Sequence, residues 1–227
     1  MIAKMFVFFL LLICFPVSHS TEKEFDYYKL VLQWPISVCN VRRSCLQPPF
    51  SEFTVHGLWP FLAPDSMVTE CSKDVLTKSK VKDTIKALRK YWPSFVDRDD
   101  FDFWSYQWLK HGTCSGLDPL PYFKLAISTT IEARQLLESL NRKASAYTPR
   151  FKPYQMNDLY DNFKAALAKK PEDKKVIQFK CNKKDGKFQL LEIYICVDKK
   201  GVALDCPTPK FIECGDNEMA EIRYPDK

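Results

Sequence analysis

The amino-acid sequence predicts an α+β fold in one domain, with an antiparallel β-sheet and several helices. Three observations favour this class: a strand-forming segment near residue 30, two predicted helices between residues 81 and 111, and a hairpin signal at Asp185-Gly186. The 227 residues contain no Gly/Ser-rich linker, internal repeat or low-complexity run. One domain is therefore favoured over two.

The N-terminal half begins with a predicted strand and a predicted helix. The segment Tyr28–Trp34 (YKLVLQW) is rich in strand formers and partly alternates, so it predicts a strand that ends at Pro35. A helix that stops at Pro93 is predicted next, because four apolar side chains recur at helical spacing: Val81, Ile85, Leu88 and Trp92.

A second helix is predicted through Phe101–His111. Asp99 or Asp100 can accept hydrogen bonds from its first backbone N–H groups, and Gly112 can end it. This helix matters to the chemistry because it carries one of the few histidines of the chain.

The C-terminal half adds two helices and a hairpin. The helices are expected from about Tyr122 to Asn141 and from Asp158 to Lys169. The strand-like segments Val176–Cys181 and Phe188–Val197 flank Asp185-Gly186, the strongest short-range signal for a hairpin turn. Antiparallel pairing of these two segments follows.

The first twenty residues have the features of a secretory signal peptide. Lys4 precedes the apolar run Met5–Pro16, and the small residues Ser18 and Ser20 follow at the spacing that a signal peptidase needs. We expect cleavage after Ser20, which leaves residues 21–227 as one secreted domain and lowers the formal net charge from +6 to +5. The apolar run is shorter than the roughly 20 residues that span a bilayer, so a membrane-spanning protein is disfavoured.

The cysteines predict a disulfide framework. Cys14 leaves with the signal, and an even number remains in a chain that passes through an oxidising export route. Four bonds are expected, and spacing alone leaves all 105 pairings open, although Cys39 and Cys45 are near enough to close a small loop. Structural zinc is the less favoured alternative, because the sequence has no Cys-x-x-Cys pair and no spare histidine.

Two histidines, His56 and His111, remain after signal cleavage. Gln107, Lys110 and His111 lie at i, i+3 and i+4 of the predicted helix and would share one face. Two imidazoles that titrate near neutrality can serve as base and acid in one turnover, and an ammonium group can stabilise charge on phosphorus. RNA cleavage through its own 2′-hydroxyl needs that pair and requires no metal or cofactor.

The alternatives are structural. A histidine beside aromatic residues is more often a hydrogen-bonded structural group than a catalyst. Trp59, Trp104 and Trp108 are more often core residues than platforms for bases. The lysine clusters at 78–90 and 169–187 are interspersed with acidic residues, which favours a solvated face over a phosphate-binding track.

Two motifs carry a resemblance that changes these odds. FTVHGLWP (Phe53–Pro60) and FWSYQWLKHGTC (Phe103–Cys114) resemble the two active-site segments of the secreted ribonuclease T2 family. LVLQWP (Leu30–Pro35) and the C-terminal half-cystine layout extend the resemblance over nearly the whole mature chain. The resemblance implies an endoribonuclease with a central antiparallel sheet flanked by helices, which cleaves single-stranded RNA through a 2′,3′-cyclic phosphate.

The resemblance also implies residue roles. His56 matches the general acid, His111 the general base and Lys110 the phosphate-stabilising lysine. Three further residues match positions that shape the active site or contact a base: Trp59, Gln33 and Phe103. The implied disulfides are Cys39 with Cys45, Cys71 with Cys114, Cys181 with Cys214, and Cys196 with Cys206.

Three positions depart from the family pattern. Gln107 stands where many members have a glutamate, Tyr106 where some have another histidine, and Phe61 where an acidic or amide residue often sits. Gln107 is retained here as a candidate catalytic residue. The departures leave rate, pH optimum and base preference open, whereas both main histidines and Lys110 are present.

Plant members of the family divide into S-type ribonucleases, which reject self pollen, and S-like ribonucleases for phosphate recovery or defence. The basic mature chain, Gln107 and the opening Phe25–Pro35 resemble the S-type, while the absence of any N-x-S/T sequon points the other way. We favour a monomeric S-type enzyme, for which a pollen F-box protein would be an implied partner. An inactive binding or storage protein on the same scaffold is a further alternative.

Overall fold

The computed structural model describes residues 24–143, 147–168, 177–207, 210–215 and 220–226. The predicted signal peptide at residues 1–20 lies outside these ranges, as do the ends of two predicted elements, Lys169 and Val176. Among the described helices, none combines the length and the apolar character that a membrane span needs.

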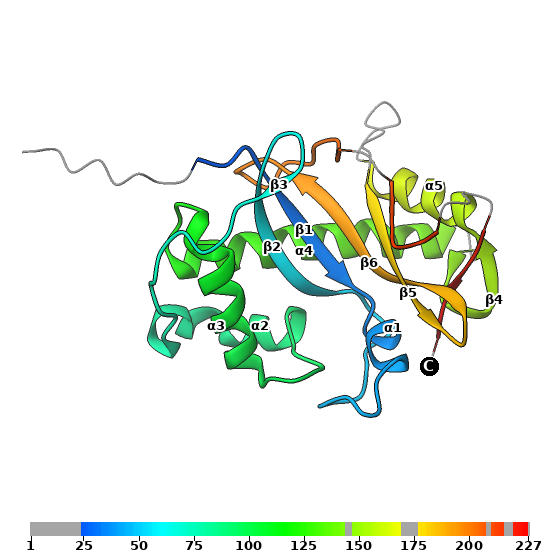
Figure 1. The fold of residues 1–227 in the computed structure, drawn as a ribbon, viewed down its shortest axis with the longest axis horizontal. Helices are drawn as coiled ribbons and strands as arrows, with labels where there is room; N and C mark the ends of the chain where they lie inside the picture. The colour runs from blue at the N-terminus through cyan, green and yellow to red at the C-terminus, as the bar shows by residue number, and fades with distance from the viewer. Residues whose placement is uncertain (1–23, 144–146, 169–176, 208–209, 216–219, 227) are drawn as a thin grey trace, which may run out of the picture.

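Within the described residues, the core element is an eight-stranded sheet in the order β3-β2-β1-β6-β5-β7, with β8 beside β6 and β4 beside β8 (Figure 1). Its pairs are antiparallel except for β5 with β7 and β6 with β8. The predicted antiparallel sheet is thus confirmed as a mostly antiparallel one. The strands are β1 (Tyr27–Gln33), β2 (Thr54–Leu62), β3 (Ser66–Met67), β4 (Arg150–Gln155), β5 (Gln178–Lys184), β6 (Lys187–Val197), β7 (Phe211–Ile212) and β8 (Glu221–Tyr224).

Helices cover one face of the sheet and lie at both of its ends. The long helix α4 passes behind β1 and β6, α2 and α3 lie beside β2, and α5 lies near β4 at the opposite end (Figure 1). This arrangement confirms the α+β class. The helical segments are α1 (Pro35–Asn40), η1 (Lys78–Thr84), α2 (Ile85–Tyr91), α3 (Asp100–Lys110), η2 (Gly112–Cys114), α4 (Pro119–Lys143) and α5 (Met156–Leu167), of which η1 and η2 are 3₁₀ helices.

The central strand β1 is buried on both faces. Tyr28, Leu30 and Leu32 belong to the main core, which includes side chains of α4. Tyr27 and Val31 point to the other face, because side chains alternate along a strand, and they join a smaller cluster there. Trp59 and Tyr194 belong to that second cluster, so the sequence pattern of β1 defines a second face that the α4 core does not occupy.

Most predicted elements are confirmed within a few residues. Asp99 caps α3, and its Oδ1 accepts a hydrogen bond from the backbone N–H of Asp102 at 2.9 Å. Asp185 and Gly186 both have positive φ, 52° and 73°, as the turn between β5 and β6 requires. The two predicted C-terminal helices correspond to α4 and α5.

The predicted helix around residues 81–92 needs a correction. Its first half, Lys78–Thr84, is a 3₁₀ helix, and α-helical geometry begins only at Ile85. Val81 and Thr84 are both buried there at i, i+3 spacing, which aligns side chains in a 3₁₀ helix. Both are also β-branched, which lowers their preference for an α-helix.

All four disulfides pair as the resemblance implied: Cys39–Cys45, Cys71–Cys114, Cys181–Cys214 and Cys196–Cys206. Cys71–Cys114 joins the segment after β3 to the 3₁₀ turn that directly follows His111. Cys196–Cys206 belongs to the second cluster, next to Tyr194.

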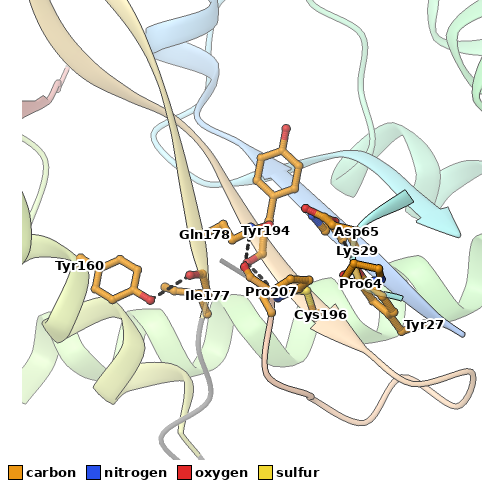
Figure 2. The surroundings of a disulfide bond; sticks show 11 residues. Tyr27, Lys29, Pro64, Asp65, Tyr160, Ile177, Gln178, Tyr194, Cys196 and Pro207 are labelled. Atoms are coloured by element: carbon orange, nitrogen blue, oxygen red, sulfur yellow. Dashed lines mark hydrogen bonds and ion pairs between the residues drawn. A yellow bond between two sulfur atoms is a disulfide. The ribbon is translucent and has the colours of Figure 1, made fainter. Parts of the chain in front are cut away.

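The turn between β2 and β3 is tied to β1 through a buried lysine. Lys29 is only 3% exposed, its Nζ lies 2.5 Å from Asp65 Oδ1, and it also lies 4.4 Å from the centre of the Phe61 ring. The Tyr27 hydroxyl donates to Asp65 Oδ1 and to the carbonyl of Pro64 (Figure 2). These contacts fix the stretch after Pro60 on the second face of the sheet.

Candidate active site

A break in the register between β1 and β2 leaves His56, a residue of β2, without a partner in the ladder. Val31 of β1 pairs with Gly57 and the next residue, Leu32, pairs with Val55, so His56 is an extra residue in the ladder. Bulges of this kind re-aim a side chain. The His56 side chain is 33% exposed, and its backbone carbonyl accepts a hydrogen bond from Nε1 of the buried Trp92 at 3.1 Å.

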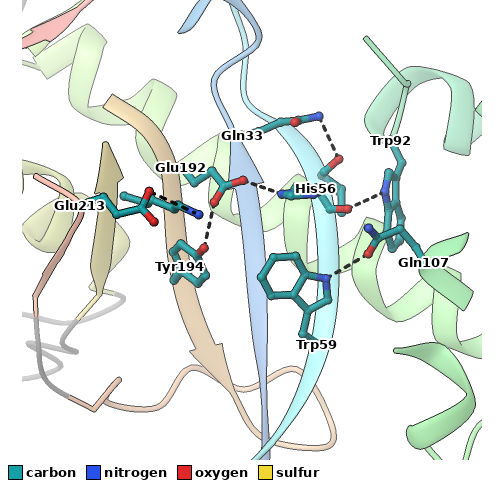
Figure 3. Close-up of polar contacts among 10 residues, drawn as sticks. Gln33, His56, Trp59, Trp92, Gln107, Glu192, Tyr194 and Glu213 are labelled. Carbon is teal, nitrogen blue, oxygen red and sulfur yellow. Dashed lines mark hydrogen bonds and ion pairs between the residues drawn. The ribbon is translucent and has the colours of Figure 1, made fainter. Parts of the chain in front are cut away.

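His56 contacts a carboxylate on another strand, and the contact is an ion pair when His56 is protonated. Its Nδ1 lies 2.5 Å from Oε1 of Glu192 on β6, across the intervening strand β1 (Figure 3). Glu192 is 4% exposed, and its other oxygen, Oε2, accepts a hydrogen bond from the Tyr194 hydroxyl at 2.9 Å. Burial works to raise the pKa of Glu192, but the charge and hydrogen bond of His56, aided by Lys180 and Tyr194, outweigh it and hold that pKa below its ordinary value.

Glu192 is a residue of the candidate site that the sequence analysis did not select. It lies inside the apolar strand FQLLEIYICV, where a lone carboxylate is the unusual residue. A charge buried in a strand needs a partner, so its position was a usable signal. The sequence did not indicate which residue is the partner, because the contact depends on the bulge at His56.

His111 occupies a different environment at the end of α3. It is 2% exposed, and its ring stacks on Trp59 with centroids 5.0 Å apart and 25° between the planes. Burial, followed by the charges of Lys110 and His56, lowers the pKa of His111 to about 3. Its Nδ1 has no hydrogen-bond partner among the described residues. This imidazole is therefore neutral at ordinary pH.

Trp59 contacts both histidines. Its ring meets His56 edge-on at 5.1 Å and stacks on His111. Its Nε1 donates to Oε1 of Gln107 at 3.0 Å (Figure 3). Gly57 permits this packing, because a Cβ atom there would overlap the Trp59 indole and come within 2.6 Å of Gln107 Oε1. The glycine of HGLWP is thus a close-approach residue.

The side chains of Gln107 and Lys110, both on α3, have different contacts. Gln107 is 2% exposed, and its amide oxygen serves Trp59. Lys110 is half-buried, and its Nζ donates to the Tyr106 hydroxyl at 3.2 Å. Arg98 lies over the same tyrosine ring at 4.5 Å, so a second cation adjoins Lys110. Tyr106 thereby holds the lysine beside the end of α3 that carries His111.

Gln33 and Phe103 flank His56. Gln33 on β1 is buried, and its Nε2 donates to the backbone carbonyl of Val55 at 3.5 Å. The Phe103 ring lies 6.1 Å from the His56 ring, with 28° between the planes. The residues that the sequence analysis selected therefore gather around two imidazoles, from β1, β2 and α3.

Charge at residue 107 should affect the protonation of His111. Gln107→Glu would place a carboxylate beside Trp59 and one helical turn before His111, where negative charge favours the protonated imidazole and opposes the causes that lower its pKa. The acidic limb of kcat/KM against pH reports the base, which must be unprotonated. We expect this limb to move to higher pH, provided that the introduced carboxyl group is ionised there.

The matched control for this experiment is Gln107→Met, which has a similar size and no charge. It should leave the acidic limb in place, even though Trp59 loses its hydrogen-bond acceptor. An acidic limb that is unmoved or shifted downward in Gln107→Glu would mean that residue 107 does not set the protonation of His111.

The fold and the site together define a class of protein. A mostly antiparallel α+β domain carries one imidazole paired with a carboxylate and a second, buried imidazole that stays neutral, with a lysine beside the latter. Two imidazoles in such different surroundings are typical of acid–base catalysts. The class is therefore that of acid–base enzymes that use two histidines.

Comparison with known proteins identifies the family. Residues 25–206 match the ribonuclease T2 family, and the chain belongs to it. It is 33% identical to "Intracellular ribonuclease LX" of Solanum lycopersicum, over 98% of this chain and 93% of that protein. It is 31% identical to "Ribonuclease S-3" of Pyrus pyrifolia, over 92% and 91% of the two chains.

A solved structure extends the similarity to three dimensions. RNase NT in complex with 5′-AMP superposes with a TM-score of 0.74 at 34% identity, covering 89% of this chain and 99% of that one. The protein is thus an endoribonuclease of the T2 family.

Proposed function

We propose that this endoribonuclease cleaves single-stranded RNA without a metal ion, by transphosphorylation to 2′,3′-cyclic phosphate ends. The observation that carries the proposal is the contrast between the two imidazoles: Glu192 holds His56 by an ion pair, whereas His111 is buried and neutral. A neutral imidazole accepts a proton and an imidazolium donates one, so the contrast supports His111 as base and His56 as acid.

The proposed reaction proceeds in one displacement at phosphorus. His111 takes the proton of the 2′-hydroxyl, the 2′-oxygen bonds to phosphorus, and the bond from phosphorus to the 5′-oxygen breaks. His56 donates a proton to the departing 5′-oxygen, and Lys110 stabilises the charge that gathers on the phosphoryl oxygens. Water then opens the cyclic phosphate with the roles of the two histidines reversed. Gln33 and Phe103 are proposed to contact a base and Trp59 to shape the active site; RNase NT binds 5′-AMP, which supports a nucleotide-binding role for this fold.

The experiment uses the purified chain without residues 1–20, in the presence of EDTA. We expect single-stranded RNA to be cut with 2′,3′-cyclic phosphate ends. DNA of the same sequence should stay intact, because it lacks the 2′-hydroxyl that supplies the nucleophile. RNA that carries 2′-O-methyl groups should also resist. Cleavage of DNA, or loss of activity with EDTA, would contradict this mechanism.

For the biological role we propose a secreted, monomeric S-type ribonuclease that acts as a cytotoxin in self-pollen rejection, with a pollen F-box protein as partner. Secretion is supported by the predicted signal peptide and the four disulfides. The S-type role is supported by Gln107, the basic chain and the similarity to Ribonuclease S-3.

The S-like role, in phosphate recovery or defence, is the alternative favoured by the missing glycosylation sequon and by the comparable identity to ribonuclease LX. Measuring the transcript in different tissues separates the two roles. Confinement to the style supports the S-type, and induction in leaf or root by phosphate starvation supports the S-like role. The inactive-scaffold alternative is disfavoured because His56, Lys110 and His111 are all present.

A further inference from the structure

Both carboxylate oxygens of Glu192 have partners. Oε1 faces Nδ1 of His56 on β2, and Oε2 accepts from the hydroxyl of Tyr194, two residues further along β6. Strand geometry places Glu192 and Tyr194 on the same face, so the strand itself presents this pair. Gln33 of β1 is the cross-strand neighbour of Glu192 and carries no charge.

The charged groups next to Glu192 come from the far side of β6, whereas His56 itself also interacts electrostatically with His111 at the end of α3. Lys180 on β5 is the cross-strand neighbour of Glu192 and favours its ionised form. Lys180 in turn lies 3.8 Å from Oε2 of Glu213 (Figure 3). The order of charges across the sheet is therefore Glu213, Lys180, Glu192 and His56, alternating in sign when His56 is protonated.

The ion pair decides which ring nitrogen of His56 can serve the substrate. An ionised carboxylate only accepts hydrogen bonds, so the proton between the two groups resides on Nδ1. The other nitrogen, Nε2, lies on the opposite side of the imidazole ring from Nδ1 and is therefore directed away from Glu192. A proton on Nε2 is the one that can be transferred.

We propose that Glu192, supported by Tyr194, is the positioning residue of His56, holding Nδ1–H against the sheet so that Nε2–H is delivered to the leaving 5′-oxygen. This inference rests on the proposed function. In the cleavage step the proton of the 2′-hydroxyl passes to His111, the bond from phosphorus to the 5′-oxygen breaks, and the Nε2 proton goes to that oxygen. His56 is then neutral. Its remaining proton stays on Nδ1, where it is hydrogen-bonded to Glu192, and Nε2 can be protonated again.

This assignment also gives the departure at residue 107 a meaning. The family pattern would place a carboxylate on α3, near the base, but this chain has Gln107 there and uses its amide for Trp59. The carboxylate paired with a histidine in this site belongs instead to β6. The negative charge of Glu192 thus lies beside the proposed acid, His56, whereas the proposed base, His111, has the uncharged Gln107 one helical turn before it.

The test compares two substrates that differ in their need for an acid. A dinucleoside phosphate has a 5′-alkoxide leaving group that must be protonated, whereas a nucleoside 3′-(4-nitrophenyl phosphate) has a leaving group that departs without a proton. For Glu192→Gln we expect kcat on the dinucleoside phosphate to fall at least about tenfold, and no further than the roughly 10²- to 10⁴-fold that the acid itself contributes. On the aryl phosphate, kcat should stay within about twofold of the wild type, because only the acid is impaired.

The pH profile supplies a second readout. The basic limb of kcat/KM on the dinucleoside phosphate should move to lower pH in Glu192→Gln, because the amide no longer stabilises the protonated ring of His56. Tyr194→Phe keeps the carboxylate and removes one hydrogen bond, so it should shift the limb in the same direction by a smaller amount. Glu213→Gln is the matched control: it neutralises a glutamate of the same charge array that contacts Lys180 and not a histidine, and both substrates should react as in the wild type.

Equal slowing of both substrates by Glu192→Gln would overturn the proposal, since the carboxylate would then act beyond the acid step. Unchanged kinetics on the dinucleoside phosphate would also overturn it. If Glu192→Gln does not fold, Tyr194→Phe decides by the same substrate comparison. A wild-type protein that cuts neither substrate would contradict the proposed ribonuclease function itself, and so is distinguishable from a failure of the positioning role.

Discussion

Replacing His111 by alanine is expected to lower kcat/KM on RNA by roughly 10²- to 10⁴-fold, or about 3 to 5 kcal/mol of transition-state stabilisation. The reason is its proposed role as the base: burial and the neighbouring cations lower its pKa to about 3, so the ring is unprotonated over the whole neutral range. In the wild type we expect an acidic limb of kcat/KM well below the ordinary histidine value of 6.5. That limb should disappear in His111→Ala.

A second variant separates chemistry from packing at this position. His111→Phe keeps an aromatic ring against Trp59 but offers no proton acceptor. It should be as inactive as His111→Ala while its thermal unfolding stays closer to that of the wild type. If His111→Phe cut RNA at a near-normal rate, His111 would have a structural role.

The sequence was most informative where local chemistry determines local structure. Asp99 or Asp100 as the cap and Gly112 as the terminator were sufficient to bound α3 within about one residue, and Asp185-Gly186 was sufficient to join β5 and β6. These features depend on neighbouring residues alone. The two-residue strands β3 and β7 could not be predicted in the same way, because each owes its conformation to a partner distant in the sequence.

In the candidate site, too, the features within a motif were predictable and the contacts between distant segments were not. Both histidines and Lys110 were predicted from their motifs, and Gln107 was placed correctly on α3. The direction of the Gln107 side chain was not predictable from i, i+4 spacing, since its hydrogen bond goes to Trp59 on β2. The pairing of His56 with Glu192 was also hidden, because it requires a bulge in one strand and a carboxylate two strands away.

The surroundings of the two histidines give identical side chains the different environments on which the proposed acid and base roles rest. His56 and His111 are both imidazoles in aromatic surroundings, and both touch Trp59. One has a carboxylate on Nδ1, and the other has a buried Nδ1 without a partner among the described residues. The difference in their chemistry therefore comes from β6 and from burial, and not from either motif.

Replacing His56 by alanine is expected to produce a loss of similar size that depends on the substrate. On a dinucleoside phosphate kcat should fall by roughly 10²- to 10⁴-fold, because the 5′-oxygen must leave without a proton. On a nucleoside 3′-(4-nitrophenyl phosphate), whose leaving group needs no acid, the loss should be much smaller. His111→Ala, by contrast, should impair both substrates, since each requires the 2′-oxygen as nucleophile.

His56→Ala also leaves the carboxylate of Glu192 buried without its cationic partner, which should lower the free energy of unfolding. The double variant His56→Ala/Glu192→Gln removes that unpaired charge, so we expect it to regain stability in a thermal unfolding experiment while its activity on the dinucleoside phosphate stays low. Recovery of activity together with stability would mean that the single variant fails because it is poorly folded, and His56 would lose its assignment as the acid. Stability restored without activity would separate the two roles of the ion pair, one in holding the fold and one in supplying a proton.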